Sequence, residues 1–222
     1  MTIASEIRLH WRPLSAASIG LAFGYTFNNY VMNVMSPHLI ASFGWERSRF
    51  ALLGLVVVLA IICRPIAGRL ADRFGERRVA LVGIVSAPLL YVLLGRLDGQ
   101  FGVLAAISAA QVVLVGGTTS VVVYTRLIAR KFSAARGLAL GIAASAPALA
   151  GAAAAPVLEM LVAAFGWRTA YGATALAVAV FGAIAFALMP PDRAEPNAQA
   201  APRRARAQVD YPALVRNPAF LL

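Results

Sequence analysis

The chain has 222 residues, a formal net charge of +11 and a mean hydropathy of +0.76. Hydrophobic residues make up 60% of it and charged residues only 13%, whereas soluble domains average about 45–50% apolar and about 25% charged residues. This composition excludes an ordinary soluble domain and indicates a protein that lies largely in a lipid bilayer. The single cysteine, Cys63, excludes an intramolecular disulfide.

Six apolar runs are long enough to cross a bilayer as helices, which takes about 20 residues each. In chain order they cover roughly residues 14–40, 50–70, 79–97, 101–127, 137–163 and 167–189. The runs are too long and too uniformly apolar for the alternating strands of a membrane barrel. The predicted fold class is therefore an all-α membrane protein with six transmembrane helices over residues 14–189.

The two flanking regions have a different composition. Residues 1–13 are polar and charged, so we expect a cytoplasmic N-terminus and no cleavable signal peptide. Residues 190–210 are rich in proline, alanine and arginine, which predicts a flexible basic cytoplasmic linker. Residues 211–222 become apolar again and are interpreted as the entry to a seventh helix, with the remainder of a second half missing.

The basic residues are divided unequally between the two sides that six crossings define. Positive loops stay in the cytoplasm, so both ends of the six-helix unit are predicted to be cytoplasmic, in a plasma or bacterial inner membrane. Because the basic residues lie between apolar runs and do not form one soluble face, a nucleic-acid partner is not expected. Four basic residues lie on the opposite side and one, Arg64, lies within the second run. The fifteen on the predicted cytoplasmic side are Arg8, Arg12, Arg69, Arg73, Arg77, Arg78, Arg126, Arg130, Lys131, Arg136, Arg193, Arg203, Arg204, Arg206 and Arg216.

A charged motif joins the second and third runs. Residues 68–78 read Gly-Arg-Leu-Ala-Asp-Arg-Phe-Gly-Glu-Arg-Arg. This stretch resembles motif A of the major facilitator superfamily, Gly-x-Leu-x-Asp-[Arg/Lys]-x-Gly-[Arg/Lys]-[Arg/Lys], and departs from it at Glu76, where the pattern has a basic residue. The resemblance implies a conformational charge network. Its matching residues here are Gly68, Leu70, Asp72, Arg73, Gly75 and Arg77.

A second resemblance concerns the loop before the fifth run. Residues 130–143 read Arg-Lys-Phe-Ser-Ala-Ala-Arg-Gly-Leu-Ala-Leu-Gly-Ile-Ala and are similar to the corresponding region of monocarboxylate and oxalate–formate carriers. The two resemblances imply a secondary active transporter that works by alternating access. Its expected partners are the bilayer, a small organic anion, a proton or counter-anion, and a C-terminal six-helix half. A weak repeat between residues 74–77 and 165–168 favours a 3+3 inverted arrangement.

Polar residues within the first and fourth runs are the candidate substrate-binding residues. Tyr25, Asn29 and Asn33 recur every four residues and so share one helix face. Polar groups are costly in hydrocarbon and usually face a cavity or another helix, and in the superfamily these two helices line the central cavity. From the fourth run we add Gln111, Thr118 and Arg126.

Enzymatic function finds no support among the sequence motifs. The chain lacks the metalloprotease, P-loop and nucleophile-elbow patterns. Its only histidines are His10 and His38, so neither a catalytic site, a metal site nor a cofactor is predicted. Two alternatives stay open: a drug or sugar carrier of the same superfamily, and a non-transporting six-helix membrane scaffold.

Overall fold

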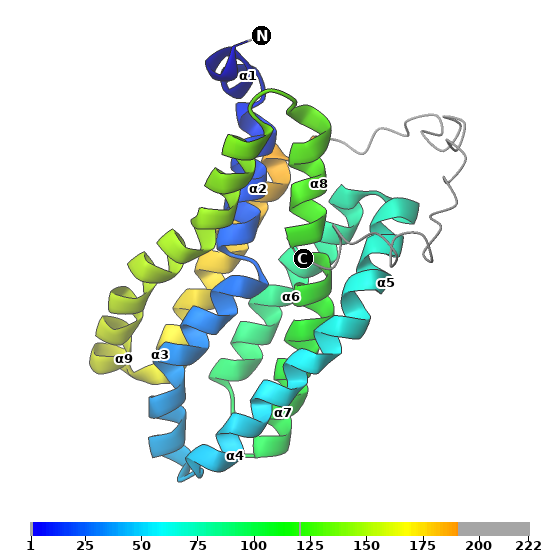
Figure 1. Ribbon diagram of the computed structural model, residues 1–222. Coiled ribbons are helices and arrows are strands. Elements are labelled where there is room, and N and C mark those ends of the chain that lie inside the picture. Colours follow the sequence, from blue (N-terminus) through cyan, green and yellow to red (C-terminus); the bar gives the residue numbers. More distant parts are fainter. Residues whose placement is uncertain (1, 120, 191–222) are drawn as a thin grey trace, which may run out of the picture. The chain divides into compact units, whose positions relative to one another are not determined.

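The computed structural model describes residues 2–119 and 121–190, and every element in these ranges is helical (Figure 1). The predicted entry helix (211–222), and the predicted linker (190–210) beyond Pro190, lie outside the described residues. So do the side chains of Asp72 and Arg126. All-helical architecture is thus confirmed for the described part.

The first predicted span is divided into two helices. After the short α1 (Ile3–Leu9), α2 covers Trp11–Ala22 and α3 covers Tyr25–Phe43. Between them Gly24 is extended, with φ −80° and ψ −158°. A side chain on Gly24 would bring its Cβ within 2.7 Å of the carbonyl oxygen of Gly20, so the break depends on glycine at this position.

The second and third predicted spans form a helical hairpin. The second consists of α4 (Arg47–Ala51), a 3₁₀ segment η1 (Leu52–Val58) and α5 (Leu59–Phe74). Gly75 follows with φ 93° and ψ 151°, a conformation that L-residues with a side chain rarely adopt. The third span is α6 (Glu76–Gly95). The motif at residues 68–78 therefore contains a sharp turn that requires glycine.

The fourth predicted span also changes its helical geometry along its length. It begins as α7 (Phe101–Ala110), continues as a π-helical segment η2 (Gln111–Gly116), and ends as α8 (Val121–Lys131). π-Helical segments are rare and often occur at functional sites. This one begins at Gln111, a residue that the sequence singles out for substrate binding.

The fifth and sixth predicted spans are one long helical segment, α9 (Arg136–Leu188), that folds back on itself. Its 53 residues would extend about 80 Å if straight, far more than the roughly 30 Å core of a bilayer. The reversal occurs at Gly166, with φ 82° and ψ 163°. Figure 1 shows the two arms, yellow-green and yellow-orange, joined at this turn.

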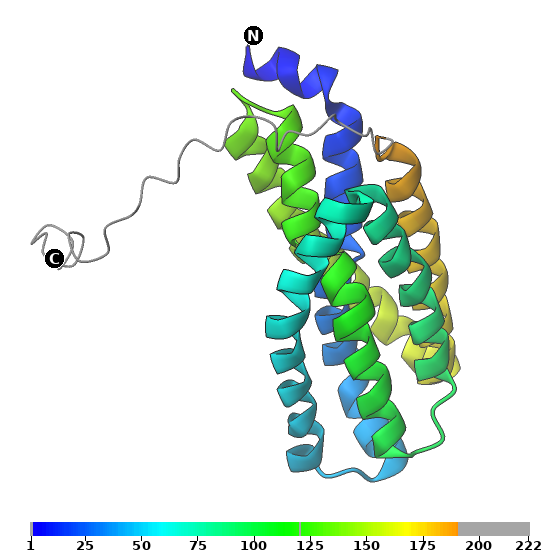
Figure 2. The same cartoon turned by 90° about the vertical axis from the view of Figure 1, so that its right-hand side faces the viewer.

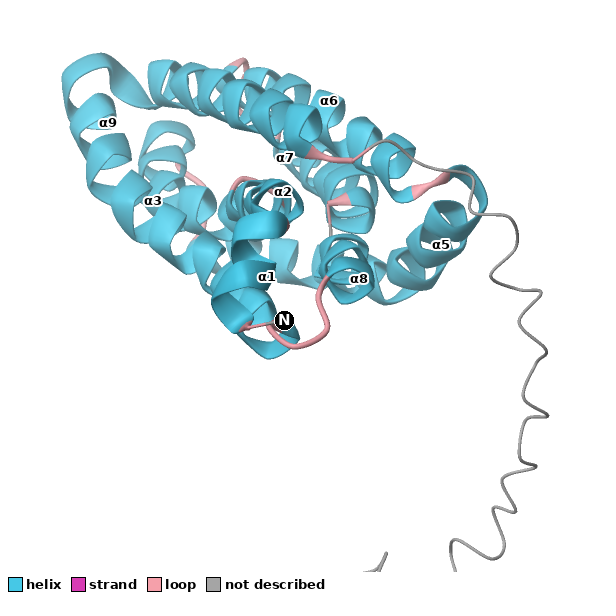
Figure 3. Ribbon diagram, turned by 90° about the horizontal axis from the view of Figure 1, so that it is seen from above, coloured by secondary structure: helices cyan, strands magenta, loops and turns pink. Residues whose placement is uncertain are grey.

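The connections alternate between two ends of the helical unit (Figures 1 and 2). One end holds α1, the Gly75 turn, the loop between α8 and α9, and the end of α9. The opposite end holds the loop from α3 to α4, the loop from α6 to α7, and the Gly166 turn. Viewed along the helices, α2 lies between α9 and α8 (Figure 3), and it contacts both. We call the end that holds α1 the N-terminal end. The opposite end is called the Trp45 end, after the tryptophan in the loop from α3 to α4.

Length and apolar composition identify two described helices that can cross a membrane, α6 and α9. A third is added if the bent pair Arg47–Cys63 and Pro65–Ala71 is one span, and Phe101–Gly116 is a shorter apolar helix. The other predicted spans are divided by the breaks described above. The sixfold crossing and its 3+3 arrangement therefore stay predictions.

Two clusters of buried apolar side chains hold the unit together. One lies towards the Trp45 end and joins α3, α6, α7 and both arms of α9 around residues such as Met35 and Tyr171. The other joins α2, α8 and α9 around Tyr124 and Ile128. Large apolar side chains are also exposed along α5 and α6, such as Ile61 and Leu89, which is the pattern expected where lipid is the surroundings.

Candidate functional site

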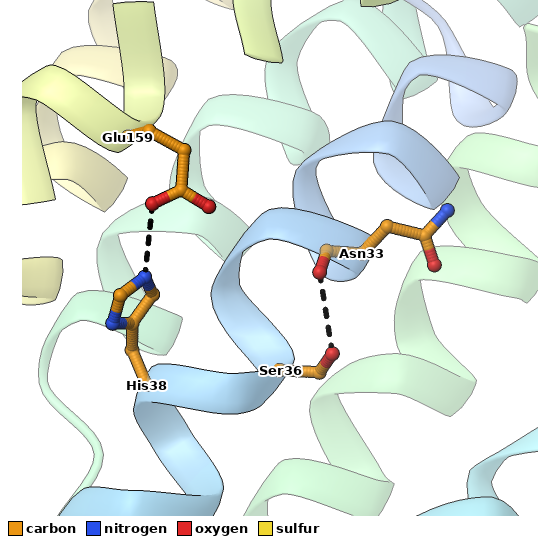
Figure 4. Close-up of polar contacts among 4 residues, drawn as sticks. All are labelled: Asn33, Ser36, His38 and Glu159. Carbon is orange, nitrogen blue, oxygen red and sulfur yellow. Dashed lines mark hydrogen bonds and ion pairs between the residues drawn. The ribbon is translucent and has the colours of Figure 1, made fainter. Parts of the chain in front are cut away.

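The polar row of the first predicted span lies on α3. Tyr25, Asn29 and Asn33 follow one another at helical steps of four, Tyr25 being half-buried and the two asparagines exposed. The ring of Tyr25 packs against the backbone of Gly116 in η2. Figure 4 shows the Asn33 amide pointing away from His38 and Glu159, while the Asn33 carbonyl accepts a hydrogen bond from Ser36 at 3.4 Å. The row therefore begins at Tyr25, where α3 contacts η2 of the fourth predicted span. It continues along α3 onto a face that is exposed at Asn29 and Asn33.

Two polar residues that the sequence singles out in the fourth predicted span, Gln111 and Thr118, are buried. Gln111 is 2% exposed, and its Oε1 has no hydrogen-bond partner among the described residues. The Thr118 hydroxyl donates to the carbonyl of Leu114 in its own helix, and Gly83 of α6 packs closely against it. Gln111 thus offers a buried amide with unused hydrogen-bonding capacity, whereas Thr118 is bonded locally.

A tight junction joins the break in the first span to the fourth span. The N–H of Tyr25, at the start of α3, donates to Oγ1 of Thr119 at 3.3 Å, and the same hydroxyl donates to the carbonyl of Val115 at 2.8 Å. Gly20 contacts the ring of Tyr124 so closely that a Cβ there would clash. These contacts bring the predicted cavity helices together.

Sequence reasoning did not single out this junction. The available signal was the spacing of Gly20 and Gly24, a small-xxx-small pattern that allows close helix approach in membranes. Its partners, Thr119 and Tyr124, lie about a hundred residues later in the chain, so the pairing itself carries no sequence signature.

The motif at 68–78 lies at the N-terminal end. Gly68 is buried in α5, and Gly75 forms the turn into α6. The Arg73 guanidinium lies 5.3 Å from the ring of Phe74, and that of Arg77 lies 4.4 Å from the ring of Phe186 in α9. Asp72 belongs to α5 by its backbone. Arg77 thereby connects the motif to the end of α9.

Glu76, the departure from the family pattern, is also engaged across helices. It is buried, and its Oε1 lies 3.6 Å from Nη2 of Arg130 in α8. The acidic residue therefore faces a basic one on the neighbouring helix. A basic residue at position 76 would instead place like charges together, which is unfavourable.

Glu6 of α1 fastens the N-terminal segment to the loop before α9. Its carboxylate accepts hydrogen bonds from the N–H of Ser133 at 2.7 Å, the hydroxyl of Ser133 at 3.1 Å and the N–H of Ala135 at 2.6 Å. The backbone bonds, that from Ser133 first, lower the pKa of Glu6 below its ordinary value. A carboxylate is also favoured at a helix N-terminus, here the start of α9.

The Trp45 end is closed by aromatic and polar contacts. The indole N–H groups of Trp45 and Trp167 donate to the carbonyl of Gly99 at 3.2 Å and to Oγ of Ser42 at 3.1 Å. Both indoles are buried. Buried rings and satisfied N–H groups indicate that they pack the loops together.

At this end a side-chain contact joins the first and the fifth predicted spans. Nε2 of His38 in α3 lies 3.2 Å from Oε2 of Glu159 in α9 (Figure 4). Both side chains are partly exposed. No group of three or more histidine, cysteine or acidic side chains suited to a metal occurs within the described ranges.

Both ends of the unit are thus fastened by contacts between different helices, and a polar face on α3 lies between them. A model of the Major Facilitator Superfamily matches residues 17–222, which is most of the chain. A comparison with curated proteins gives no match. The charged turn at one end, the helical segments and this match lead to one conclusion: the chain belongs to the Major Facilitator Superfamily, whose members are membrane transporters.

Proposed function

We propose that the chain carries a small organic anion, such as a monocarboxylate, across the membrane by alternating access. The observation that carries this proposal is the open polar face of Asn29 and Asn33, which begins at the Tyr25–Thr119 junction. Superfamily membership supports membrane transport in general. The substrate class and the solute path are proposed from the positions of the carboxylates and of the polar side chains on α3 and η2.

The substrate class is supported by the positions of the carboxylates. Among the described side chains, Glu6 and Glu76 lie at the N-terminal end, and Glu46, Asp98 and Glu159 lie at the opposite end. None of them lies beside Asn29. A carboxylate-free polar face suits an anionic solute, because like charges repel. The similarity of residues 130–143 to monocarboxylate and oxalate–formate carriers favours the same class.

Asn29, Asn33 and Gln111 are proposed to bind the substrate, with Tyr25, Thr118 and Arg126 beside them. Asparagine and glutamine amides donate two N–H bonds each and so suit a carboxylate. In this proposal six helices, arranged as a 3+3 inverted repeat, face a second six-helix half across the solute path. A proton or counter-anion is coupled to transport, and both ends of the six-helix unit are cytoplasmic.

The charged motif is proposed to fasten the N-terminal end in one conformation and release it in the other. Gly68, Asp72, Arg73, Gly75 and Arg77 make up this latch. The contact of Arg77 with Phe186 supports the idea, since it joins α6 to the end of α9. Rocking of one helix group against another has to break such contacts.

The experiment is uptake of radiolabelled lactate, pyruvate, oxalate and formate into proteoliposomes that contain this chain together with the proposed C-terminal six-helix half. Saturable uptake of at least one anion is expected. Asn29→Ala and Asn33→Ala should raise KM, Asp72→Asn should lower the maximal rate, and Thr169→Ala, an exposed hydroxyl at the Trp45 end, should change neither. Uptake of sugars or drugs alone would favour the other carrier class, and absence of any transport would favour a scaffold.

A further inference from the structure

A cavity at the N-terminal end takes no part in the proposed solute path. It has a volume of about 390 Å³ and is open on one side. Its walls come from the start of α2, the start of α6, the end of α8 and the end of α9. It therefore lies where these four helices meet.

The polar lining of this cavity is basic. Arg12, Arg77 and Lys131 contribute three positive charges, and His10 adds an imidazole. Three of these side chains lie against aromatic rings: Arg12 over Trp11 at 5.8 Å, Arg77 over Phe186 at 4.4 Å, and His10 edge-on to Phe132 at 5.6 Å. No carboxylate is among the described lining residues. Such a cavity suits an anion with several oxygen acceptors.

The remaining wall is apolar and continues onto a lipid-type surface. Leu9 and Leu188 line the cavity. Leu9 is 63% exposed, and Trp11, next to the lining residues His10 and Arg12 in the sequence, is 51% exposed. One helical turn from Arg77, Leu81 is exposed on α6, and one turn from Leu188, Ile184 is exposed on α9. A ligand with an anionic headgroup and apolar chains matches this arrangement, in which a basic cavity is followed by exposed apolar side chains.

We propose that the cavity binds the phosphate headgroup of an anionic phospholipid, such as phosphatidylglycerol, from the leaflet at the N-terminal end. The phosphate lies among Arg12, Arg77 and Lys131, and the acyl chains follow the exposed face of α6 and α9. Basic pockets between membrane helices are a recurrent setting for anionic headgroups. The bound lipid joins α2 and α6 to α8 and α9, and so favours the arrangement in which this end is closed.

The chain's own residues beyond Pro190 are a rival occupant. That segment carries Asp192, Glu195 and Asp210 but five arginines, so its net charge is positive. A basic segment is repelled by a basic cavity, which favours the lipid.

The test is native mass spectrometry of the detergent-purified protein titrated with phosphatidylglycerol or phosphatidylcholine. Wild-type protein should retain phosphatidylglycerol preferentially. In the double variant Arg12→Gln, Lys131→Gln, affinity for phosphatidylglycerol should fall roughly tenfold to thirtyfold, because each basic residue contributes about a threefold to fivefold change. Affinity for phosphatidylcholine should not change.

The matched control is Arg8→Gln, Arg136→Gln, which removes two exposed charges at the same end outside the cavity and should change affinity less than twofold. Equal loss in both double variants would overturn the proposal, since it would reflect general surface charge. Wild-type measurements alone also decide the question, should the cavity variant fail to fold. No preference for phosphatidylglycerol over phosphatidylcholine, or displacement of the lipid by millimolar inorganic phosphate, would contradict a lipid site.

Discussion

At the scale of single residues, two carboxylates and one glycine hold the N-terminal end together. Contacts between segments distant in the sequence are made by Glu6, to Ser133, and by Glu76, to Arg130. The chain reverses its direction at Gly75. Sequence reasoning identified Gly75 through the family motif. It treated Glu6 as an ordinary charge near the terminus, because nothing local shows that Ser133 and Ala135 lie beside it.

Replacement of Gly75 should destabilise the protein. Gly75→Ala places a side chain at φ 93° and ψ 151°, a region that costs roughly 1–3 kcal/mol for other residues. The apparent melting temperature in detergent should fall. Gly102→Ala is the control, because Gly102 lies in α7 with open space around its Cβ position and an ordinary φ. An equal effect of the two substitutions would show that the turn at Gly75 is not strained by a side chain.

Glu6 should make stability depend on acid pH. Its pKa in the folded protein lies below the ordinary value of 4.5, so the carboxylate stabilises the folded chain at pH values above 4.5. This contribution is lost as the pH falls through the folded-state pKa. Melting temperatures of wild type and Glu6→Gln should therefore differ at pH 7 and converge as the pH drops below 4.5.

Glu46→Gln provides the comparison for this pH series. Glu46 is exposed at the opposite end, and its carboxylate accepts a hydrogen bond from the hydroxyl of the nearby Ser48. Its substitution should leave the acid dependence as in the wild type. If Glu6→Gln also keeps the full acid dependence, the Glu6 contacts do not stabilise the N-terminal end.

At the scale of helices, the apolar runs correctly predict where helices occur but not how regular they are. The runs at 79–97 and 167–189 correspond closely to α6 and the second arm of α9. The run at 14–40 hides the break at Gly24, since this break is stabilised by Thr119, some ninety residues away. Apolar composition indicates that a helix lies in lipid or in a protein core. A break within the helix depends on hydrogen-bond partners such as Thr119, which are distant in the sequence and become neighbours only in the folded chain.

The break itself yields a prediction about Thr119. Thr119→Val keeps the shape of the side chain but removes the acceptor of the Tyr25 N–H, so a partly buried hydrogen bond at the start of α3 is lost. We expect a loss of about 1 kcal/mol or more, measured as reversible unfolding in mixed micelles. Thr119→Ser should retain most of the stability.

Thr174→Val is a matched control for this substitution. Thr174 is buried in α9, and its hydroxyl donates to the carbonyl of Ala170 at 2.8 Å, four residues earlier. This bond within its own helix is the same as that of Thr119 to Val115, so the comparison isolates the contact of Thr119 with Tyr25. Similar losses at Thr119 and Thr174 would mean that the contact across the break contributes nothing measurable.

At the scale of the whole unit, the two ends are fastened in chemically different ways. The N-terminal end uses charged groups, with Glu6 at the start of α9 and Glu76 beside Arg130. The Trp45 end uses buried indoles, supplemented by the pair of His38 and Glu159. Alternating access requires one end to open while the other stays closed, and the polar face of α3 lies between them.

The central claim is that this α3 face borders a water-filled solute path, and cysteine reactivity tests it most directly. In a Cys63→Ala background, single cysteines replace Asn29 or Asn33, and cysteines at Val85 or Leu89 on the exposed apolar face of α6 serve as controls. Only a thiolate in contact with water reacts with a charged methanethiosulfonate reagent. In native membranes the cysteines at 29 and 33 should react and those at 85 and 89 should not. Cysteines at 29 and 33 that are as unreactive as the one at 89 would contradict the account, because they would place the polar face of α3 against lipid or protein.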